Sequence, residues 1–288
     1  MLNQIISCFV NFFKPSKTTQ PTHKRNGYKR AICMGINEYS NPANNLKGCV
    51  NDVNAWSSMF MDVYHFDEVM HLVNANVTKN KVKSSLRTTI EISKPGDMIV
   101  IQYSGHGTYV ADRSGDEANG QDEALALYDG YLIDDEIREI VATIQDNIDL
   151  VFILDCCFSG TATRMHMDEE DYYKAVKFIL SETNTTPILT PPHKICEYFD
   201  SSEQIMENKM REILLSGSND AESAWDASVG GTYHGAMTYF ATKILNQTPN
   251  ITYKELHDKL RTHLPSSKYP QHPQLEGKEE NKNQLVFQ

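Results

Sequence analysis

Two short clusters of polar and small residues directly follow apolar runs that have the composition of buried strands. Residues 98–103 lead into the sequence SGHG, which contains His106, and residues 150–154 lead into DCCFSG, which contains Cys157. Glycine allows the chain to turn sharply after a strand, and parallel strands end at the same edge of a sheet. We therefore expect the side chains of His106 and Cys157 to meet in one crevice.

A cysteine beside a histidine can carry out nucleophilic acyl transfer. An imidazolium ion stabilises the thiolate of Cys157, and the same imidazole can protonate the leaving amine. The backbone N–H groups of Gly107 and Cys157 are the candidate donors to the oxyanion. Either side chain alone is more often structural, but a buried structural cysteine does not need a glycine-rich turn, so their joint occurrence favours catalysis.

Zinc binding is the competing chemistry for these residues. Cys156, Cys157 and His106 would supply three ligands, but adjacent cysteines seldom reach one tetrahedral ion. The sequence also has no CxxC motif and no second histidine pair near them. The nucleophilic pair is therefore the favoured interpretation.

The elements that must position this pair alternate between strands and helices. Helical spacing of apolar residues predicts helices over residues 50–63, 136–144 and 237–245, and Thr252 with Glu255 forms a capping box ahead of another helix. Five apolar runs between them are too continuous for half-exposed strands: residues 31–36, 69–73, 98–103, 150–154 and 213–215. The repeated order predicts an α/β fold with a mostly parallel sheet covered on both faces.

Two segments interrupt this alternation. Residues 108–123 are predicted to be a polar loop with five carboxylates, for which a solvated surface hairpin is the alternative. Residues 161–210 contain charged runs and the sequence NTTPILTPP, and are too long for an ordinary connection. The second segment is predicted to be a flexible linker.

The composition excludes several classes of protein. Of the 288 residues 40% are hydrophobic and 23% charged, unlike a disordered, collagen-like or multi-spanning membrane protein. The net charge of −11 argues against nucleic-acid binding, and the six cysteines are interpreted as reduced thiols. A cytoplasmic protein is therefore expected.

The first 29 residues are predicted to lie outside the folded domain. Residues 1–13 are apolar without the pattern of a secretory signal, and residues 14–29 form a polar linker. An amphipathic helix over residues 1–13, with Cys8 as a lipidation site, could contact a membrane. Docking on the domain or disorder is favoured over that contact.

These motifs resemble those of the metacaspases and their bacterial relatives among the caspase-like cysteine peptidases. The resemblance extends from Arg30 to Phe287 and is carried by YSGHG, DCCFSG, LKGCVND, LIDDE and HPQLEG. It implies a caspase-like three-layer sandwich with about six strands, in which His106 and Cys157 are the catalytic dyad. Cys156 falls on the position before the nucleophile and is not assigned a catalytic role.

The resemblance also implies a substrate class. Metacaspases cleave after Arg or Lys, and the residues that match their acidic specificity pocket are Cys49, Asp52, Ser104 and Asp155. Two carboxylates would bind a guanidinium group through charge-assisted hydrogen bonds and would reject an aspartate side chain. The alternative role for Asp52 is a carboxylate in the first turn of a helix.

Calcium is a further expectation from the resemblance. Its ligands would be Asp122, Asp134 and Asp135, but Arg164 stands where the family has another Asp. A cation replaces an oxygen ligand at that position, so calcium is expected at most as an activator. Asp134 and Asp135 could instead be the N-cap and first-turn residues of the helix over residues 136–144.

The family organisation would divide the domain into a large part (30–160), the linker (161–210) and a small part (211–288). Self-cleavage would follow a basic residue of the linker, and Trp225 and Asp226 would line the substrate cleft. Protein or peptide substrates and a monomer are expected. The alternatives are a catalytically silent scaffold and an effector recruited to membranes by residues 1–13. The candidate cleavage sites are Arg164, Lys174, Lys177, Lys194 and Lys209.

Overall fold

A six-stranded sheet forms the centre of the protein. The computed structural model describes residues 27–111, 121–156, 210–218, 224–229 and 231–288. The strand order is β11-β8-β7-β3-β1-β2, and every neighbouring pair is parallel except β11 with β8. The strands are β1 (Lys29–Gly35), β2 (Glu68–Val73), β3 (Met98–Ser104), β7 (Asp149–Asp155), β8 (Ile213–Ser216) and β11 (Gln274–Glu276).

The five predicted strands are therefore confirmed, and the sixth, β11, comes from the HPQLEG motif. Both faces of the sheet are buried, because successive residues of a strand belong to different apolar clusters. In β1, Ala31 and Cys33 face one cluster, and Ile32 and Met34 face the other. This alternation explains why the strand sequences are continuously apolar.

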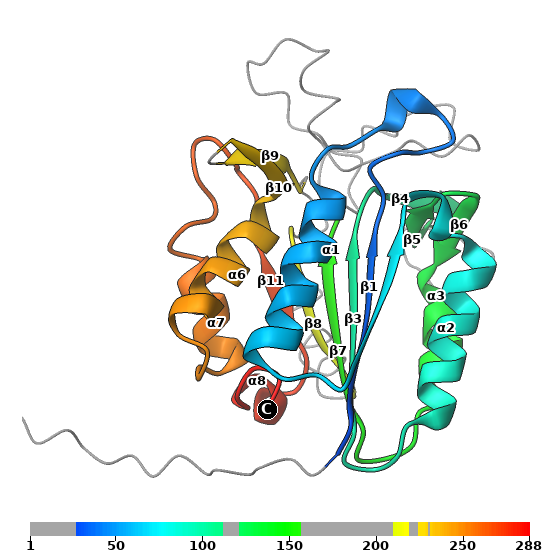
Figure 1. Cartoon of the computed structure of the whole chain (residues 1–288), viewed down its shortest axis with the longest axis vertical. Helices are drawn as coiled ribbons and strands as arrows, with labels where there is room; N and C mark the ends of the chain where they lie inside the picture. Colours follow the sequence, from blue (N-terminus) through cyan, green and yellow to red (C-terminus); the bar gives the residue numbers. More distant parts are fainter. Residues whose placement is uncertain (1–26, 112–120, 157–209, 219–223, 230) are drawn as a thin grey trace, which may run out of the picture.

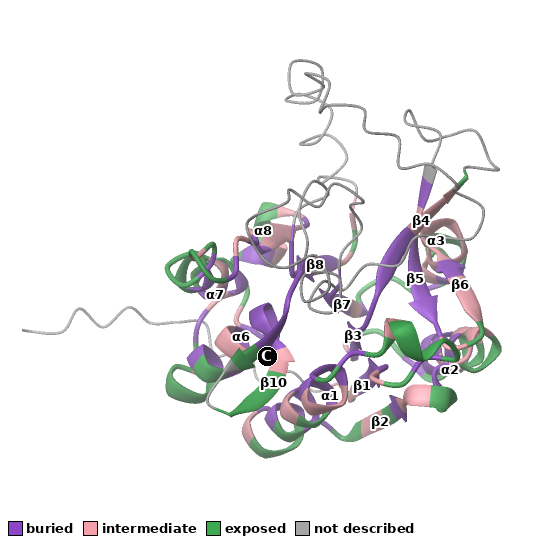
Figure 2. Cartoon of the chain, turned by 90° about the horizontal axis from the view of Figure 1, so that it is seen from above, coloured by how far each residue is buried: buried purple, intermediate pink, exposed green. Residues whose placement is uncertain are grey.

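Helices cover both faces, so the predicted three-layer arrangement is confirmed (Figure 1). One face is covered by α1 (Cys49–Ser58), which continues into a π-helix (Met59–Val63), and by α6 (Ala236–Gln247) and α7 (Tyr253–Leu260). The other face is covered by α2 (Lys79–Ile92) and α3 (Asp134–Val141). Figure 2 shows the buried strands between helices whose outer surfaces are exposed. Short helices lie at Pro42–Asn44, Asn74–Asn76 and α8 (Glu279–Lys282).

The predicted capping box is confirmed at the start of α7. The backbone N–H of Glu255 donates to Oγ1 of Thr252 at 3.1 Å, and the N–H of Thr252 donates to a carboxylate oxygen of Glu255 at 2.8 Å. Among the helices that the structure describes, none combines the length and the apolarity needed to cross a membrane. Residues 1–26, with the proposed membrane-contact segment, lie outside the described residues.

Two predicted segments are corrected. The helix expected over residues 136–144 begins at Asp134 and ends at Val141, so Asp134 lies inside its first turn and is not the N-cap. Much of the expected polar loop is strand: β4 (Gly107–Ala111), β5 (Gln121–Leu127) and β6 (Gly130–Ile133) form an antiparallel sheet, as the hairpin alternative requires. The polar composition hid the buried positions of these strands, such as Thr108 and Asp122. Residues 112–120 are outside the described part.

A small hairpin and one helix have no counterpart in the sequence prediction. Strands β9 (Asp226–Val229) and β10 (Thr232–Gly235) pair antiparallel beside the upper end of α1 (Figure 1). Helix α2 buries Val82, Leu86 and Ile90 at helical spacing. The linker assigned to residues 161–210 lies outside the described residues except for Met210, so the division into large and small parts stays a prediction.

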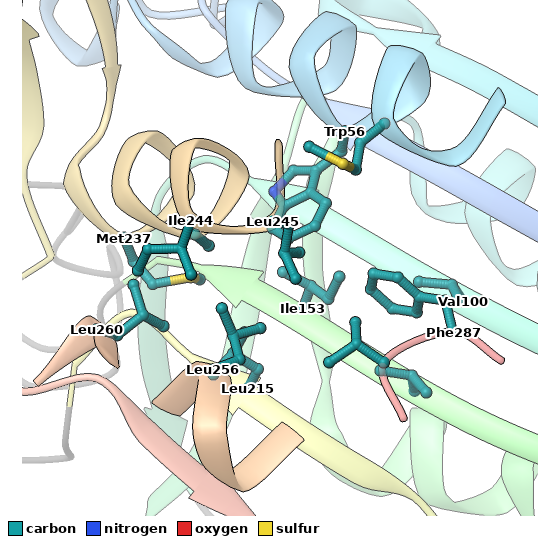
Figure 3. Close-up of a cluster of buried hydrophobic side chains, with 14 of the residues drawn as sticks. Trp56, Val100, Ile153, Leu215, Met237, Ile244, Leu245, Leu256, Leu260 and Phe287 are labelled. Atoms are coloured by element: carbon teal, nitrogen blue, oxygen red, sulfur yellow. The ribbon is translucent and has the colours of Figure 1, made fainter. Parts of the chain in front are cut away.

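An aromatic cluster joins α1 and α6 to the end of the chain (Figure 3). The ring of Phe287 lies 5.0 Å from Tyr64, 5.2 Å from Phe60 and 6.2 Å from Trp56, with edge-to-face geometry in each pair. Nε1 of Trp56 donates to Oγ1 of Thr238 at 3.2 Å, so the indole has a polar partner although it is fully buried. The cluster therefore packs the end of the chain against α1 and the π-helix that continues it.

Replacing Phe287 with alanine should lower the free energy of unfolding by about 3–5 kcal/mol, because it removes a fully buried ring and leaves a cavity. Urea denaturation followed by tryptophan fluorescence measures this loss. Met61→Ala is the control: its side chain is 47% exposed, and the change should stay within about 0.5 kcal/mol. Similar losses in both variants would contradict the central role of Phe287.

The lower edge of the sheet depends on a buried carboxylate at the start of β3. Asp97 accepts hydrogen bonds from the backbone N–H groups of Tyr28 and Lys94, and its carboxylate lies 2.8 Å from the guanidinium of Arg30. Burial would raise the pKa of Asp97, but these hydrogen bonds and the charge of Arg30 outweigh burial and lower the pKa below its ordinary value.

Because the pKa of Asp97 is lowered by folding, its contribution to stability is present above the ordinary aspartate pKa of about 4 and is lost as the pH falls from there through the lowered pKa of the folded state. The Asp97→Asn variant should therefore be less stable at neutral pH and lose less stability on acidification. Thermal unfolding between about pH 7 and pH 3 measures both effects. Asp62→Asn, at an exposed position, is the control; an unchanged pH dependence in Asp97→Asn would refute the assignment.

Candidate active site

The carboxyl ends of β3 and β7 are held side by side. Ser104, the last residue of β3, is in register with Asp155, the last residue of β7. His106 follows Ser104 by two positions, and Cys157 follows Asp155 by two positions in the sequence. Cys157 lies outside the described residues, so the structure describes the histidine of the predicted pair, and its pairing with Cys157 stays a prediction.

His106 is buried in an orientation that leaves a defined nitrogen for proton transfer. Its side chain is 3% exposed, and Nε2 lies 2.8 Å from the backbone oxygen of Asn44. A carbonyl oxygen only accepts hydrogen bonds, so Nε2 must carry the hydrogen. In the neutral imidazole, Nδ1 is then the basic nitrogen.

Two tyrosines fix the loop that carries His106. The hydroxyl of Tyr39 accepts from the backbone N–H of His106 at 2.8 Å, and the two rings lie 5.0 Å apart. The hydroxyl of Tyr103 donates to the backbone oxygens of His106 at 2.9 Å and Ala126 at 2.8 Å. A Cβ atom at position 105 would collide with both hydroxyls, which explains why Gly105 precedes the histidine.

Tyr103 remains a hydrogen-bond donor throughout the neutral pH range. Burial raises its pKa well above the ordinary value, and the nearby Tyr39 and Cys156 raise it further. The hydroxyl therefore keeps its proton and continues to hold the His106 carbonyl. Cys156 itself is 1% exposed and packs in the core cluster on the α2 and α3 face of the sheet, consistent with a structural role.

Three of the four predicted pocket residues are brought together above the sheet. Asp52 and Asp155 are both fully buried, and Ser104 donates from Oγ to Oδ2 of Asp52 at 2.6 Å. Cys49 is also fully buried, one turn before Asp52 in α1. Asp52 does lie in the first turn of α1, as its alternative role requires, but its carboxylate binds other elements of the fold.

The carboxylates of Asp52 and Asp155 both accept hydrogen bonds from backbone N–H groups at the beginning of α6. The backbone N–H of Gly235, the residue before the helix, donates to the two carboxylate oxygens of Asp52 at 3.0 and 2.9 Å. The N–H of Thr238 in the first turn donates to Asp155 at 2.9 Å. The first N–H groups of a helix have no partner inside it and carry a partial positive charge, so the two carboxylates complete this helix end.

The two predicted cleft residues of the small part are buried and bound to other loops. Trp225 is 7% exposed, and its backbone N–H donates to Oε1 of Gln271 at 3.0 Å. Asp226 is 8% exposed, and its Oδ2 accepts from the backbone N–H of Lys47 at 2.7 Å. Both residues organise the region, and direct contact with substrate stays a prediction.

The three candidate calcium ligands do not form a metal-binding group. Asp122 is buried on β5, whereas Asp134 and Asp135 both form ion pairs with Arg138 in the first turns of α3. Within residues that the structure describes, no three His, Cys, Asp or Glu side chains gather in a way that could hold a metal ion. The described carboxylates therefore do not fit calcium by themselves, and Arg164 lies outside the described residues.

Several residues of the site were not predicted from the sequence. Asn44 acts through its backbone oxygen, which no sequence motif reveals. Tyr39 belongs to a loop that precedes α1, and only the folded chain places it on the histidine. His234 of β10 lies with Nδ1 3.2 Å from Oδ1 of Asp52, and its position three residues before the predicted helix 237–245 was the available signal.

A mostly parallel six-stranded sheet, covered by helices and carrying a buried histidine at the end of β3, defines a caspase-like α/β protein. The fold is similar to that of protein GSU0716 from Geobacter sulfurreducens, with a TM-score of 0.67 and 23% identity over 90% of this chain and 98% of that one. Caspase-1 from Spodoptera frugiperda gives a TM-score of 0.58 and 10% identity, over 88% and 87% of the two chains.

Sequence comparisons point to relatives of one kind. Residues 29–166 match the model described as metacaspase, peptidase C14 domain. The chain is 28% identical to Metacaspase-1 of Scheffersomyces stipitis over 86% of its own length, and 32% identical to Metacaspase-1 of Debaryomyces hansenii over 87%. It spans 70% and 64% of the length of these two relatives. The chain is therefore similar to the metacaspases, whose model carries the description peptidase C14 domain.

The Tyr103→Phe variant should lose about 1–3 kcal/mol of unfolding free energy, because the buried carbonyl of Ala126 loses its hydroxyl donor. The carbonyl of His106 keeps the N–H of Ala126 as a partner. Chemical denaturation measures the loss. Tyr28→Phe removes a hydroxyl from a side chain that is 51% exposed and should have little effect; an equally small effect of Tyr103→Phe would contradict the role given to its hydroxyl.

Proposed function

We propose that this protein is a metacaspase, an endopeptidase that hydrolyses the peptide bond after Arg or Lys, with Cys157 as nucleophile and His106 as acid and base. The observation that carries the proposal is the register of β3 and β7. Ser104 and Asp155 are paired, and the two reactive residues each follow that pair by two positions. This spacing supports an approach of the thiol to the imidazole.

In the proposed reaction, Nδ1 of His106 takes the thiol proton of Cys157, and the thiolate attacks the carbonyl carbon of the scissile bond. The N–H groups of Gly107 and Cys157 stabilise the oxyanion. The C–N bond then breaks, and His106 gives its proton to the leaving amine. A water molecule, deprotonated by His106, hydrolyses the thioester and releases the acid product and the thiol.

Selectivity for a basic side chain is supported by the two buried carboxylates. Asp52 and Asp155 lie at the same edge of the sheet as His106, and each is already oriented by α6. Fixed acceptors lose little conformational freedom when they bind a cation, and a guanidinium group can use two of its donors at once. An acidic substrate side chain would meet like charge and would be rejected.

Other features of the proposal extend beyond the dyad. Protein or peptide substrates, a monomeric state and self-cleavage within residues 161–210 are part of it. Calcium is a separate variable of the assay, because the described carboxylates do not form a site alone. No step of the proposed reaction uses the metal.

The test is cleavage of two fluorogenic peptides that differ only in Arg or Asp before the reporter, with and without calcium. The Cys157→Ala variant should lose Arg-peptide cleavage by at least about 10³-fold, because the nucleophile is removed. Cys156→Ala is the matched control and should retain cleavage, since this neighbouring thiol is buried in an apolar core cluster.

Equal rates for Cys157→Ala and the unmodified protein would refute the dyad. Preferential cleavage of the Asp peptide would refute the basic specificity. Failure to cleave either peptide in both conditions, together with failure of Cys157 to react with an Arg-tipped thiol probe, would favour the silent scaffold.

A further inference from the structure

His234 contacts the carboxylate to which the proposed function assigns the substrate cation. Its Nδ1 lies 3.2 Å from Oδ1 of Asp52, while the side chain of His234 is 19% exposed and that of Asp52 is fully buried. The Ser104 hydroxyl and the Gly235 N–H also donate to this carboxylate. A hydroxyl and an amide stay neutral, whereas an imidazole can take up a proton and become a cation.

The position of His234 is fixed by close packing between β10 and the beginning of α1. A Cβ atom at position 48 would lie 2.7 Å from both N and Cα of His234, so Gly48 allows the two segments to approach. On either side of His234, Asn51 donates to the backbone oxygen of Tyr233 at 2.9 Å, and Gly235 donates to Asp52. These contacts fix the backbone position from which the imidazole reaches Asp52.

The charged and titratable groups around His234 leave Asp52 as its direct ionic partner in the described part of the chain. The ring of Tyr239, on α6, lies 6.1 Å from the imidazole of His234. The ammonium group of Lys243, also on α6, lies 5.8 Å from that tyrosine ring and has the tyrosine as its contact. From the loop before α1, Lys47 lies over the ring of Tyr233 at 4.8 Å. On β9, Asp226 is paired in register with Gly235 and binds the backbone of Lys47.

We propose that His234 is a specificity-determining residue that makes the binding of Arg or Lys substrates depend on pH, by competing for the charge of Asp52 when it is protonated. The neutral imidazole donates the same hydrogen bond to Asp52 but leaves the negative charge available to a substrate cation. The protonated imidazole supplies its own positive charge at that place. Basic substrates are then bound weakly in acid and tightly above neutral pH.

This inference rests on the proposed function, and binding can be measured without turnover. The full chain carrying Cys157→Ala removes the reaction and the titration of its nucleophile from the measurement. The ligands are two fluorescein-labelled peptides that differ at one position, Arg in one and citrulline in the other. Citrulline has nearly the shape of Arg without the charge, so it separates charge from shape.

In the protein with His234, the Arg peptide should bind about tenfold more weakly near pH 5.5 than near pH 7.5. A factor of ten is expected when protonation of the histidine and binding of the peptide oppose each other by the equivalent of one pH unit. His234→Asn places an amide nitrogen close to the position of Nδ1 and cannot titrate, so its affinity should change less than about twofold over the same range. His71→Asn, on the exposed side of β2, is the matched control and should behave like the parent. Fluorescence anisotropy gives each dissociation constant.

The outcomes separate the inference from the function on which it rests. If the Arg peptide binds no better than the citrulline peptide at either pH, the proposed basic specificity itself is wrong. If Arg is preferred but His234→Asn keeps the full pH dependence, or the citrulline peptide shows the same dependence, the role of His234 is wrong.

A second measurement uses the parent protein with its own His234, so it does not depend on the folding of the variant. Because coupling is reciprocal, binding of the Arg peptide must expel a proton from His234. Calorimetry near pH 6 in buffers of different ionisation enthalpy should detect a fraction of a proton released per peptide bound. The absence of proton release would overturn the proposal.

Discussion

Two buried carboxylates at the carboxyl edge of the sheet, bound to the first turn of one helix, hold the site together. Burying a carboxylate is costly unless protein donors replace the lost water. Asp52 comes from α1 and Asp155 from β7, and their donors, Gly235 and Thr238, both lie at the start of α6. Each partner therefore satisfies the other, and the segment after residue 210 is fixed against the segment before residue 156.

The histidine loop follows the same physical rule with neutral groups. The sharp turn after β3 leaves the backbone N–H and oxygen of His106 inside the protein, where they need partners. The hydroxyls of Tyr39 and Tyr103 supply these partners, and Gly105 leaves the space for both. The imidazole is then held by a hydrogen bond to a backbone oxygen, so its orientation is set before any substrate arrives.

Together these contacts place His106 and the two buried carboxylates at one edge of the sheet. The last residue of β3, Ser104, binds Asp52, and the histidine follows two positions later. His234 reaches the Asp52 carboxylate from β10, so the role proposed for this histidine requires no contact with His106.

The sequence by itself determined the parallel sheet and its double covering, because strands buried on both faces must be continuously apolar. It predicted His106, Asp52 and Asp155 as site residues, but not the partners that the structure gives them. The strands at residues 107–111 and 121–127 were missed because their polar residues are buried by tertiary contacts. Only the tertiary structure decided that Tyr39, the Asn44 carbonyl and His234 belong to the site, since each acts through a contact with residues distant in the sequence.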